Sequence, residues 1–322
     1  MSSFVFQRLL SFFITLAVTS VVVFGVLEWL PGNAAQVILG ETATPESLAA
    51  MEEKLGLNQP ALSRYLQWTG GLLQGHSGMS ISYDTPTADL MLERMHVTLP
   101  LAIMAMSFTV LIALSLGLYA ASKQNSAADA GVMTISQLGL ALPNFWLAIL
   151  LILLFAVHLQ LVSAGGFPGW SEEDGGGIWT GVAALLLPAM ALAAVQTAIL
   201  TRVTRSAVIE SMSEDYVRTA RAKGLSKSQV LWGHVLRNAM IPVVTVMGLQ
   251  FGNLITSAIV IENVFVLPGI GRLIFQAIAN RDLIVVRDVV MLLSAMVILI
   301  NFLIDLLYAW IDPRIKTVAA GS

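Results

Sequence analysis

The sequence contains no cysteine among its 322 residues and only four histidines, at positions 76, 96, 158 and 234. Without cysteine the chain can form no disulfide, no thiolate nucleophile and no cysteine-ligated metal site. The histidines are scattered and show no paired spacing, such as His-Glu-x-x-His, that is typical of metal binding. We therefore expect no catalytic residue and no metal site in this chain.

Charge is also scarce, since only 11% of the residues are charged and 57% are apolar. A soluble domain carries about 25% charged residues, which cover its surface. The mean hydropathy of +0.80 agrees with a chain whose main solvent is lipid. The formal net charge of −3 offers no basis for a nucleic-acid partner, and we predict none.

A phosphate-binding P-loop is absent as well. That motif, Gly-x-x-x-x-Gly-Lys-Ser/Thr, needs a glycine directly before its lysine. The residues that precede the five lysines are Glu53, Ser122, Ala222, Ser226 and Ile315. The chain therefore has no ATP site of its own, and any ATP must be bound by a separate subunit.

Six apolar runs are each long enough to cross a bilayer, which takes about 20 helical residues. They cover residues 9–30, 98–121, 130–161, 178–200, 241–261 and 289–311. The first run is longer than the apolar core of a signal peptide, about 7–15 residues, so we expect it to be retained. The sequence thus predicts an all-α membrane protein with six transmembrane helices.

The distribution of charge predicts the orientation of these helices. Six spans place both termini on one side, and lysine and arginine are held on the cytoplasmic side. Eleven of the 17 basic residues fall on the side of the termini, whereas 14 of the 20 acidic residues fall on the other. We expect the termini and the segment at 201–240 to be cytoplasmic, and 262–288 to be a polar loop or re-entrant segment outside.

The most distinctive stretch is a basic, amphipathic island at residues 215–242. It predicts two short helices with a break at Gly224, where a left-handed cap is favourable. Ser211 or Ser213 is expected to cap the first helix. Ser226 opens the second with the Ser-x-x-Gln spacing of a capping box.

This island reads YVRTARAKGL at 216–225, followed by H-x-LRNA-x-IP at 234–242. It resembles the cytoplasmic coupling loop of ABC importer permeases, in the form used by dipeptide, oligopeptide and nickel permeases. The general family pattern has a glutamate and a proline where this chain has Arg218 and Arg237. The block at 260–272, VIENVFVLPGIGR, resembles the family's external hairpin.

The end of the chain, NFLIDLLYAWIDPR at 301–314, resembles the family's C-terminal signature, and Pro31-Gly32 after the first span also fits. The resemblance implies an ABC importer type I permease fold in the inner membrane. It divides the chain into a first segment at 1–30, a small external subdomain at 31–97 and a permease core at 98–322. For the subdomain, a solvated loop without a recognition role is an equal alternative.

The resemblance also implies the partners. These would be a second homologous permease, two ATP-binding subunits that hold ATP and magnesium, and an extracytoplasmic solute-binding protein. This chain would form half of the pathway in an importer of peptides or similar small solutes, without a cofactor of its own. Its coupling loop, at 211–240, would dock into a groove on an ATP-binding subunit.

The residues predicted to couple to the ATPase are Tyr216, Val217, Arg218, Thr219, Ala220, Arg221, Lys223, Gly224, Leu225 and His234. Tyr216, Val217 and Ala220 share one helix face, and this apolar face is expected to dock into the partner groove. The alternative is a basic interfacial helix that lies on anionic lipid.

Polar residues inside the spans are candidates for the pathway, because such a stripe should face protein or water. Gln250, Asn253 and Ser257 lie at i, i+3 and i+7 of the fifth span. Gln196 in the fourth span, and Asn144 beside Pro143 in the third, are further candidates. Hydrogen bonding between helices is an equal alternative for this stripe.

Asp305 is the one acid well inside a predicted span. It is either a proton relay, as in ion-coupled transporters, or a structural or inter-subunit contact, which we favour. An ion-coupled secondary transporter, the alternative function, would be expected to carry several such groups and inverted repeats. A membrane-embedded enzyme would need converging catalytic groups, and the predicted spans contain none.

Overall fold

The computed structural model describes residues 2–29, 35, 39–40, 43–54 and 56–311. Within this part of the chain every extended regular element is a helix, which confirms the predicted all-α fold class. The Pro31-Gly32 pair, and the C-terminal signature from Asp312 onwards, lie outside the described residues.

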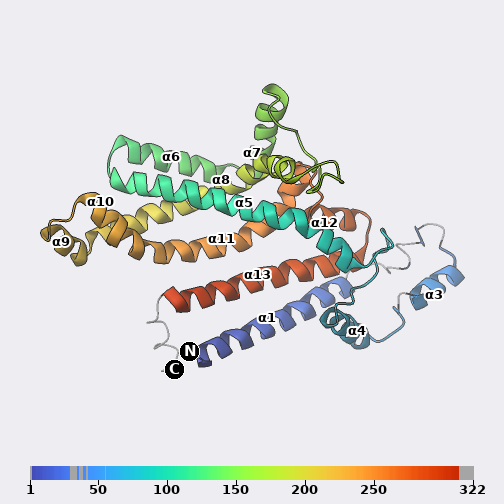
Figure 1. The fold of residues 1–322 in the computed structure, drawn as a ribbon. Helices are drawn as coiled ribbons and strands as arrows, with labels where there is room; N and C mark the ends of the chain where they lie inside the picture. The colour runs from blue at the N-terminus through green and yellow to red at the C-terminus, as the bar shows by residue number, and fades with distance from the viewer. Residues whose placement is uncertain (1, 30–34, 36–38, 41–42, 55, 312–322) are drawn as a thin grey trace.

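Five helices are long and apolar enough to cross a membrane, and they run side by side along the molecule (Figure 1). These are α1 (Ser2–Trp29), α5 (Thr87–Ser122), α8 (Ile178–Ser213), α11 (Leu236–Val264) and α13 (Leu283–Ile311). Several extend well beyond the apolar runs that predicted them, because polar residues at the helix ends continue the same backbone hydrogen bonding.

The run at 130–161 is not one helix. It divides into α6 (Ala127–Ala141) and α7 (Asn144–Leu151), and the latter continues as the π-helical segment η2 (Ile152–His158). The two halves meet at an angle of 102°. Leu142, directly before Pro143, has an extended backbone with a ψ of 128°, and Pro143 occupies the N-cap position of α7, so the helix breaks at this pair. The number of spans is therefore five, or six if the bent pair is one span.

The prediction of a polar loop or re-entrant segment over all of 262–288 is wrong in its extent. Helix α11 continues to Val264, the short helix α12 covers Ile270–Ala279, and α13 already begins at Leu283. Apolar residues of α12 and of the first turns of α13 pack into one buried cluster with Leu90 of α5. This packing makes helices of a stretch whose charged residues had suggested a loop.

The two ends of the bundle differ. Helices α3 (Pro45–Lys54), α4 (Ala61–Leu73) and α12 lie toward one end, which we call the opposite end (Figure 1). Helices α9 (Asp215–Ala222) and α10 (Lys227–Val230) lie at the other, which we call the coupling end. Helix α1 begins, and α13 ends, toward the coupling end.

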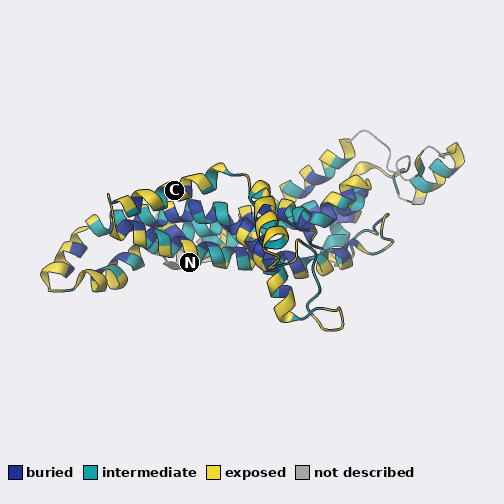
Figure 2. Cartoon of the chain, turned by 90° about the horizontal axis from the view of Figure 1, so that it is seen from above, coloured by how far each residue is buried: buried dark blue, intermediate teal, exposed yellow. Residues whose placement is uncertain are grey.

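Helices α5 and α8 form the centre of the bundle through close contacts between small side chains. The buried residues run through its middle, whereas the coupling end is mostly exposed (Figure 2). On α5 the buried residues at the centre include Ala102, Ala105, Thr109, Ala113 and Gly117. Small residues allow two helix backbones to approach closely within a membrane.

We expect Gly117→Ala to destabilise the protein by about 1–3 kcal/mol through overpacking. A methyl group at this position would lie 2.6 Å from Cβ of Thr204 and 3.0 Å from the carbonyl oxygen of Thr201. Gly131→Ala on α6 is the matched control, since its methyl group would meet open space. Thermal unfolding in detergent measures both, and equal stability of the two variants would contradict this packing.

Candidate functional site

The coupling segment, residues 214–235, contains the two short helices that the sequence predicts. Helix α9 ends before Gly224, whose φ of +86° confirms the predicted left-handed position. Helix α10 opens with the predicted capping box. Ser226 N–H donates to Oε1 of Gln229 at 2.9 Å, and Gln229 N–H donates to Oγ of Ser226 at 3.3 Å. The chain then enters the π-helical segment η3 (Leu231–Val235).

The predicted serine cap of α9 is wrong. Glu214 occupies the N-cap position and makes no side-chain cap, because α8 continues to Ser213 and keeps both serines inside it. Instead, the Ser211 hydroxyl bonds to that of Tyr216 and donates to the carbonyl oxygen of Val235 at 3.2 Å. This contact joins the end of α8 to the start of α9 and to η3.

The apolar face of α9 is turned into the protein itself. Val217 and Ala220 are 1% and 7% exposed and pack in one cluster with buried residues of α5, α8 and α11. Tyr216 and Leu225 are half-buried at the edge of this cluster. The structure therefore corrects the prediction that this face docks into a partner groove, because its own bundle already covers it.

The exposed face of the coupling segment is polar and carries cations. Its predicted members are Arg218, Thr219, Arg221, Lys223, Gly224 and His234. The Arg218 side chain is 80% exposed, and its ion-pair partner among the described residues is Asp215, at 3.4 Å. The prediction omitted Trp232, which is 61% exposed, although a tryptophan within a polar stretch is a recognisable signal for a contact residue.

The five pathway candidates do not form one site. Gln250 and Gln196 are 3% and 4% exposed, and Nε2 of Gln250 donates to the carbonyl oxygen of Gln196 at 3.1 Å. These two residues thus join α11 to α8, as the alternative interpretation holds. Asn253 is exposed on α11, while Ser257 and Asn144 are half-buried.

Asp305 forms an ion pair with Arg8, with 3.1 Å between Oδ2 and Nη1. The pair joins α13 to α1 near the coupling end. Aromatic contact between Phe12 and Phe302 accompanies it, with ring centroids 5.4 Å apart. This geometry agrees with the favoured interpretation of Asp305 as a structural contact, and it places the partner within the same chain.

Two buried carboxylates at the opposite end were not recognised from the sequence. Asp282 is 1% exposed and its Oδ2 accepts from Ser80 Oγ at 2.7 Å, Ile81 N at 2.9 Å and Ser82 N at 3.0 Å. Its Oδ1 accepts from Val285 N at 3.3 Å, so it also caps α13. Its place directly before an apolar run was a usable N-cap signal.

Asp288, six residues further along the chain and within α13, is also 1% exposed. It accepts from Trp68 Nε1 at 2.8 Å and from Thr87 Oγ1 at 2.5 Å. The Arg287 guanidinium lies 4.6 Å from the centre of the Trp68 ring and donates to Asp288 at 3.2 Å. Together with Asp282, this aspartate attaches the segment 68–87 to the start of α13, about 200 residues away.

Glu262 is a third buried acid at this end, with an exposed fraction of 0%. Its carboxylate accepts from Thr98 Oγ1 at 2.6 Å and from the backbone N–H of Gly271 at 2.7 Å, at the start of α12. The Thr98 hydroxyl oxygen in turn accepts from Ile270 N at 2.9 Å. Glu262 therefore joins α11, α5 and α12. A separate point concerns metal binding: among the described residues, no group of three histidine, aspartate or glutamate side chains could hold a metal ion.

Comparison with known proteins identifies the family. Residues 1–102 match the N-terminal model, and residues 113–317 the main model, of the binding-protein-dependent transport system inner membrane component. The chain belongs to this family. It is therefore a multi-pass inner-membrane permease, and the predicted non-catalytic role without a cofactor is confirmed.

Similar curated proteins cover almost the whole permease. It is 38% identical to the dipeptide transport permease DppB of Alkalihalophilus pseudofirmus, over 98% of this chain and 100% of that protein. It is 39% identical to the glutathione transport permease GsiC of Escherichia coli O1:K1, over 98% and 99%. The inward-facing MetNI methionine ABC transporter shares the fold, with a TM-score of 0.58, 18% identity and coverage of 69% and 96%. Transport systems of this family work with an ATPase and a binding protein.

Proposed function

We propose that this permease is the membrane subunit of an ATP-driven importer of peptides or similar small solutes. The proposal is supported by full-length relatives whose names specify dipeptide, di/tripeptide and glutathione transport. The ion-coupled alternative loses its main residue, because Asp305 already has an ion-pair partner in Arg8.

The coupling segment is the proposed contact with the ATP-binding subunit. The observation that carries this role is its two-sidedness, since the apolar side packs on α5, α8 and α11 while the polar side is exposed at the end of the bundle. A force applied to the exposed side would reach the membrane helices through the buried side. Arg218, Arg221 and Lys223 supply cations for an acidic partner surface.

We propose the orientation on the same grounds. The coupling end would be cytoplasmic, together with both chain termini. The segment at 31–97 and α12 would then lie on the outer face, where a solute-binding protein delivers its cargo. Two ATP-binding subunits and a second, homologous permease would complete the importer, and the second permease would supply the other half of the pathway.

Asn253 is the best-placed pathway candidate. It is exposed on α11 between Leu249 and Val260, which are also exposed. A polar amide within a membrane-spanning helix is unfavourable against lipid. We therefore propose that the face of α11 that carries Asn253 borders water or the second permease. Ser257 and Thr256 lie one turn further along this part of α11.

The test is co-purification of the permease with its ATP-binding subunits, comparing wild type with the double variant Arg218→Glu, Arg221→Glu. Reversing two exposed cations at an interface is expected to weaken binding by about 2 kcal/mol or more, or about thirty-fold. Arg281→Glu, which reverses an exposed cation at the opposite end, is the control.

The same variants distinguish the lipid alternative. If the coupling segment only lies on anionic lipid, the double variant will bind less well to anionic liposomes and will retain the ATP-binding subunits. A wild-type permease that never co-purifies with an ATP-binding subunit, and that transports without ATP, would refute the proposed function.

A further inference from the structure

Helix α6 is attached to the bundle in an unusual way. Its only buried residues are Asp129 and Ser136, both polar. None of its residues belongs to the buried hydrophobic clusters of the described chain. Among its large apolar side chains, Ile135 and Leu138 are exposed by 68% and 61%, and Val132, Met133 and Leu140 are half-buried. The side chains of α6 that are buried against the bundle are therefore polar.

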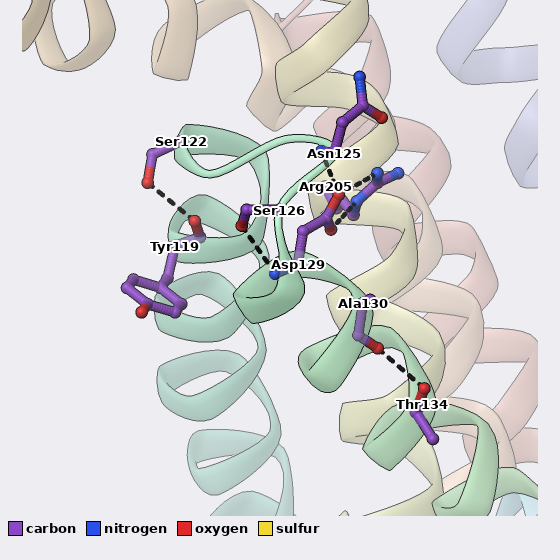
Figure 3. A network of polar contacts seen from close by, with 8 residues as sticks. All are labelled: Tyr119, Ser122, Asn125, Ser126, Asp129, Ala130, Thr134 and Arg205. Atoms are coloured by element: carbon purple, nitrogen blue, oxygen red, sulfur yellow. Dashed lines mark hydrogen bonds and ion pairs between the residues drawn. The ribbon is translucent and has the colours of Figure 1, made fainter.

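The main polar contact is a two-pronged ion pair between Asp129 and Arg205 of α8 (Figure 3). Arg205 donates from Nε to Oδ1 at 2.6 Å and from Nη2 to Oδ2 at 2.7 Å. Asp129 Oδ2 also accepts from Asn125 N at 3.0 Å, and Asn125 has a left-handed φ of 63° in the turn between α5 and α6. The planar arginine fork fixes both the distance and the orientation of its partner.

A second polar contact follows the same line between the two helices. Arg202, one turn before Arg205 on α8, donates to the side-chain oxygen of Gln137, two turns further along α6. Between these helices the backbones also come close, because a methyl group at Gly139 would lie 3.5 Å from Cβ of Ala198. Two arginines of α8 thus hold α6 along more than half of its length.

Helix α8 leads directly into the coupling segment. Only Glu214 separates the end of α8 at Ser213 from the start of α9 at Asp215. Val217 and Ala220 of α9 pack in the same cluster as Leu200, Ala207 and Val208 of α8. We expect a displacement of α9 to move the C-terminal part of α8, in which Arg205 and Arg202 lie about two and three turns before the end of the helix.

We propose that Asp129 and Arg205 are positioning residues that transmit the movement of the coupling segment to α6. From α6 the movement reaches the 102° bend at Pro143, and through it α7, which packs in a different cluster with α5, α8 and α11. This inference rests on the proposed function, because it assumes that an ATP-binding subunit moves the coupling segment. A partly buried ion pair suits this role, since its net contribution to stability is small while its geometry is strict.

The experiment uses the whole importer reconstituted in liposomes, and the solute-loaded binding protein is added to the assay. Three quantities are measured: assembled complex, ATP hydrolysis, and uptake of labelled Ala-Ala or labelled glutathione, whichever the wild type transports. The variants are Asp129→Asn, Arg205→Lys and the exchanged pair Asp129→Arg with Arg205→Asp. Lys123→Gln is the matched control, because it removes an exposed cation of the same α5–α6 turn that forms no ion pair within the described residues.

In the single variants we expect assembly and ATP hydrolysis near wild-type values. The number of solute molecules transported per ATP hydrolysed should fall about fivefold or more. Fivefold is the lower end of the range over which one coupled site in a protein typically changes another. The exchanged pair should recover part of this ratio, and Lys123→Gln should leave it unchanged. A purely structural pair would instead lower assembly, hydrolysis and uptake together.

Two results would overturn the inference. One is that both single variants transport as much solute per ATP hydrolysed as the wild type does. The other is a joint loss of complex, hydrolysis and uptake in all variants, which would make the pair a folding element. Failure of the proposed function looks different, because the wild-type assembly would then show no ATP-dependent uptake at all.

Discussion

Replacing Asp282 by alanine is expected to lower the free energy of unfolding of the permease by about 2–4 kcal/mol, because hydrogen bonds to a charged group contribute about 1.5–3 kcal/mol and each buried donor left without an acceptor costs about 1–3 kcal/mol. Its carboxylate receives three hydrogen bonds from the segment Ser80–Ser82 and a fourth from Val285 N, which it caps. Alanine would remove the acceptor of all four donors, of which Ser80 Oγ and Val285 N are buried. Loss of a helix cap alone costs about 1 kcal/mol.

Thermal unfolding in detergent and protease sensitivity of the segment 68–87 measure this effect. Asp84→Asn is the control, since Asp84 belongs to the same segment, is exposed, and has a left-handed φ of 48° that asparagine also tolerates. Asp282→Asn should have an intermediate unfolding temperature, because its amide oxygen can still accept hydrogen bonds whereas its amide nitrogen would face a donor. If Asp282→Ala unfolds at the same temperature as Asp84→Asn, this carboxylate does not hold the segment.

A second large effect is expected around Glu262, where Gly269→Ala should destabilise the permease by about 3 kcal/mol. The φ of Gly269 is −106°, so alanine suffers no backbone strain there. The added methyl group would overlap the carboxyl atoms of Glu262 instead. Those atoms cannot move aside without breaking the hydrogen bonds from Thr98 and Gly271.

A double-mutant cycle separates this overlap from other effects. In a Glu262→Ala background the carboxyl atoms are gone, so Gly269→Ala should cost about 2–3 kcal/mol less than in the wild type. Gly252→Ala on α11 is the matched glycine control, since its methyl group would meet only Cγ1 of Val297 at an ordinary 3.6 Å. Equal costs of Gly269→Ala in both backgrounds would show that Glu262 does not occupy the position described.

The sequence predicted the elements with local causes. Gly224 predicted a break because its backbone conformation depends on a missing side chain, and the structure gives it a φ of +86°. The Ser226 capping box involves residues three positions apart and was confirmed for the same reason. Pro143 lay in a predicted span, and the break between α6 and α7 arises at the extended backbone of Leu142 directly before it.

The sequence could not decide where the polar residues of the spans lie. Gln250 and Asn253 are three residues apart on one helix, yet the first is 3% exposed and the second is exposed. The difference arises because α8, more than 40 residues earlier, covers only one side of α11. The apolar face of α9 was likewise assigned to a partner, since periodicity shows that a face is apolar but not what covers it.

By itself the sequence determined the membrane environment, the all-α fold class, the family resemblance and the break at Gly224. These depend on composition and on interactions within one or two helical turns. Only the tertiary structure decided that Asp282 holds residues 80–82, that Glu262 lies at the start of α12, and that Arg205 holds α6. Such contacts bring polar groups together after helices distant in sequence have packed, and burial then requires that each group find a partner.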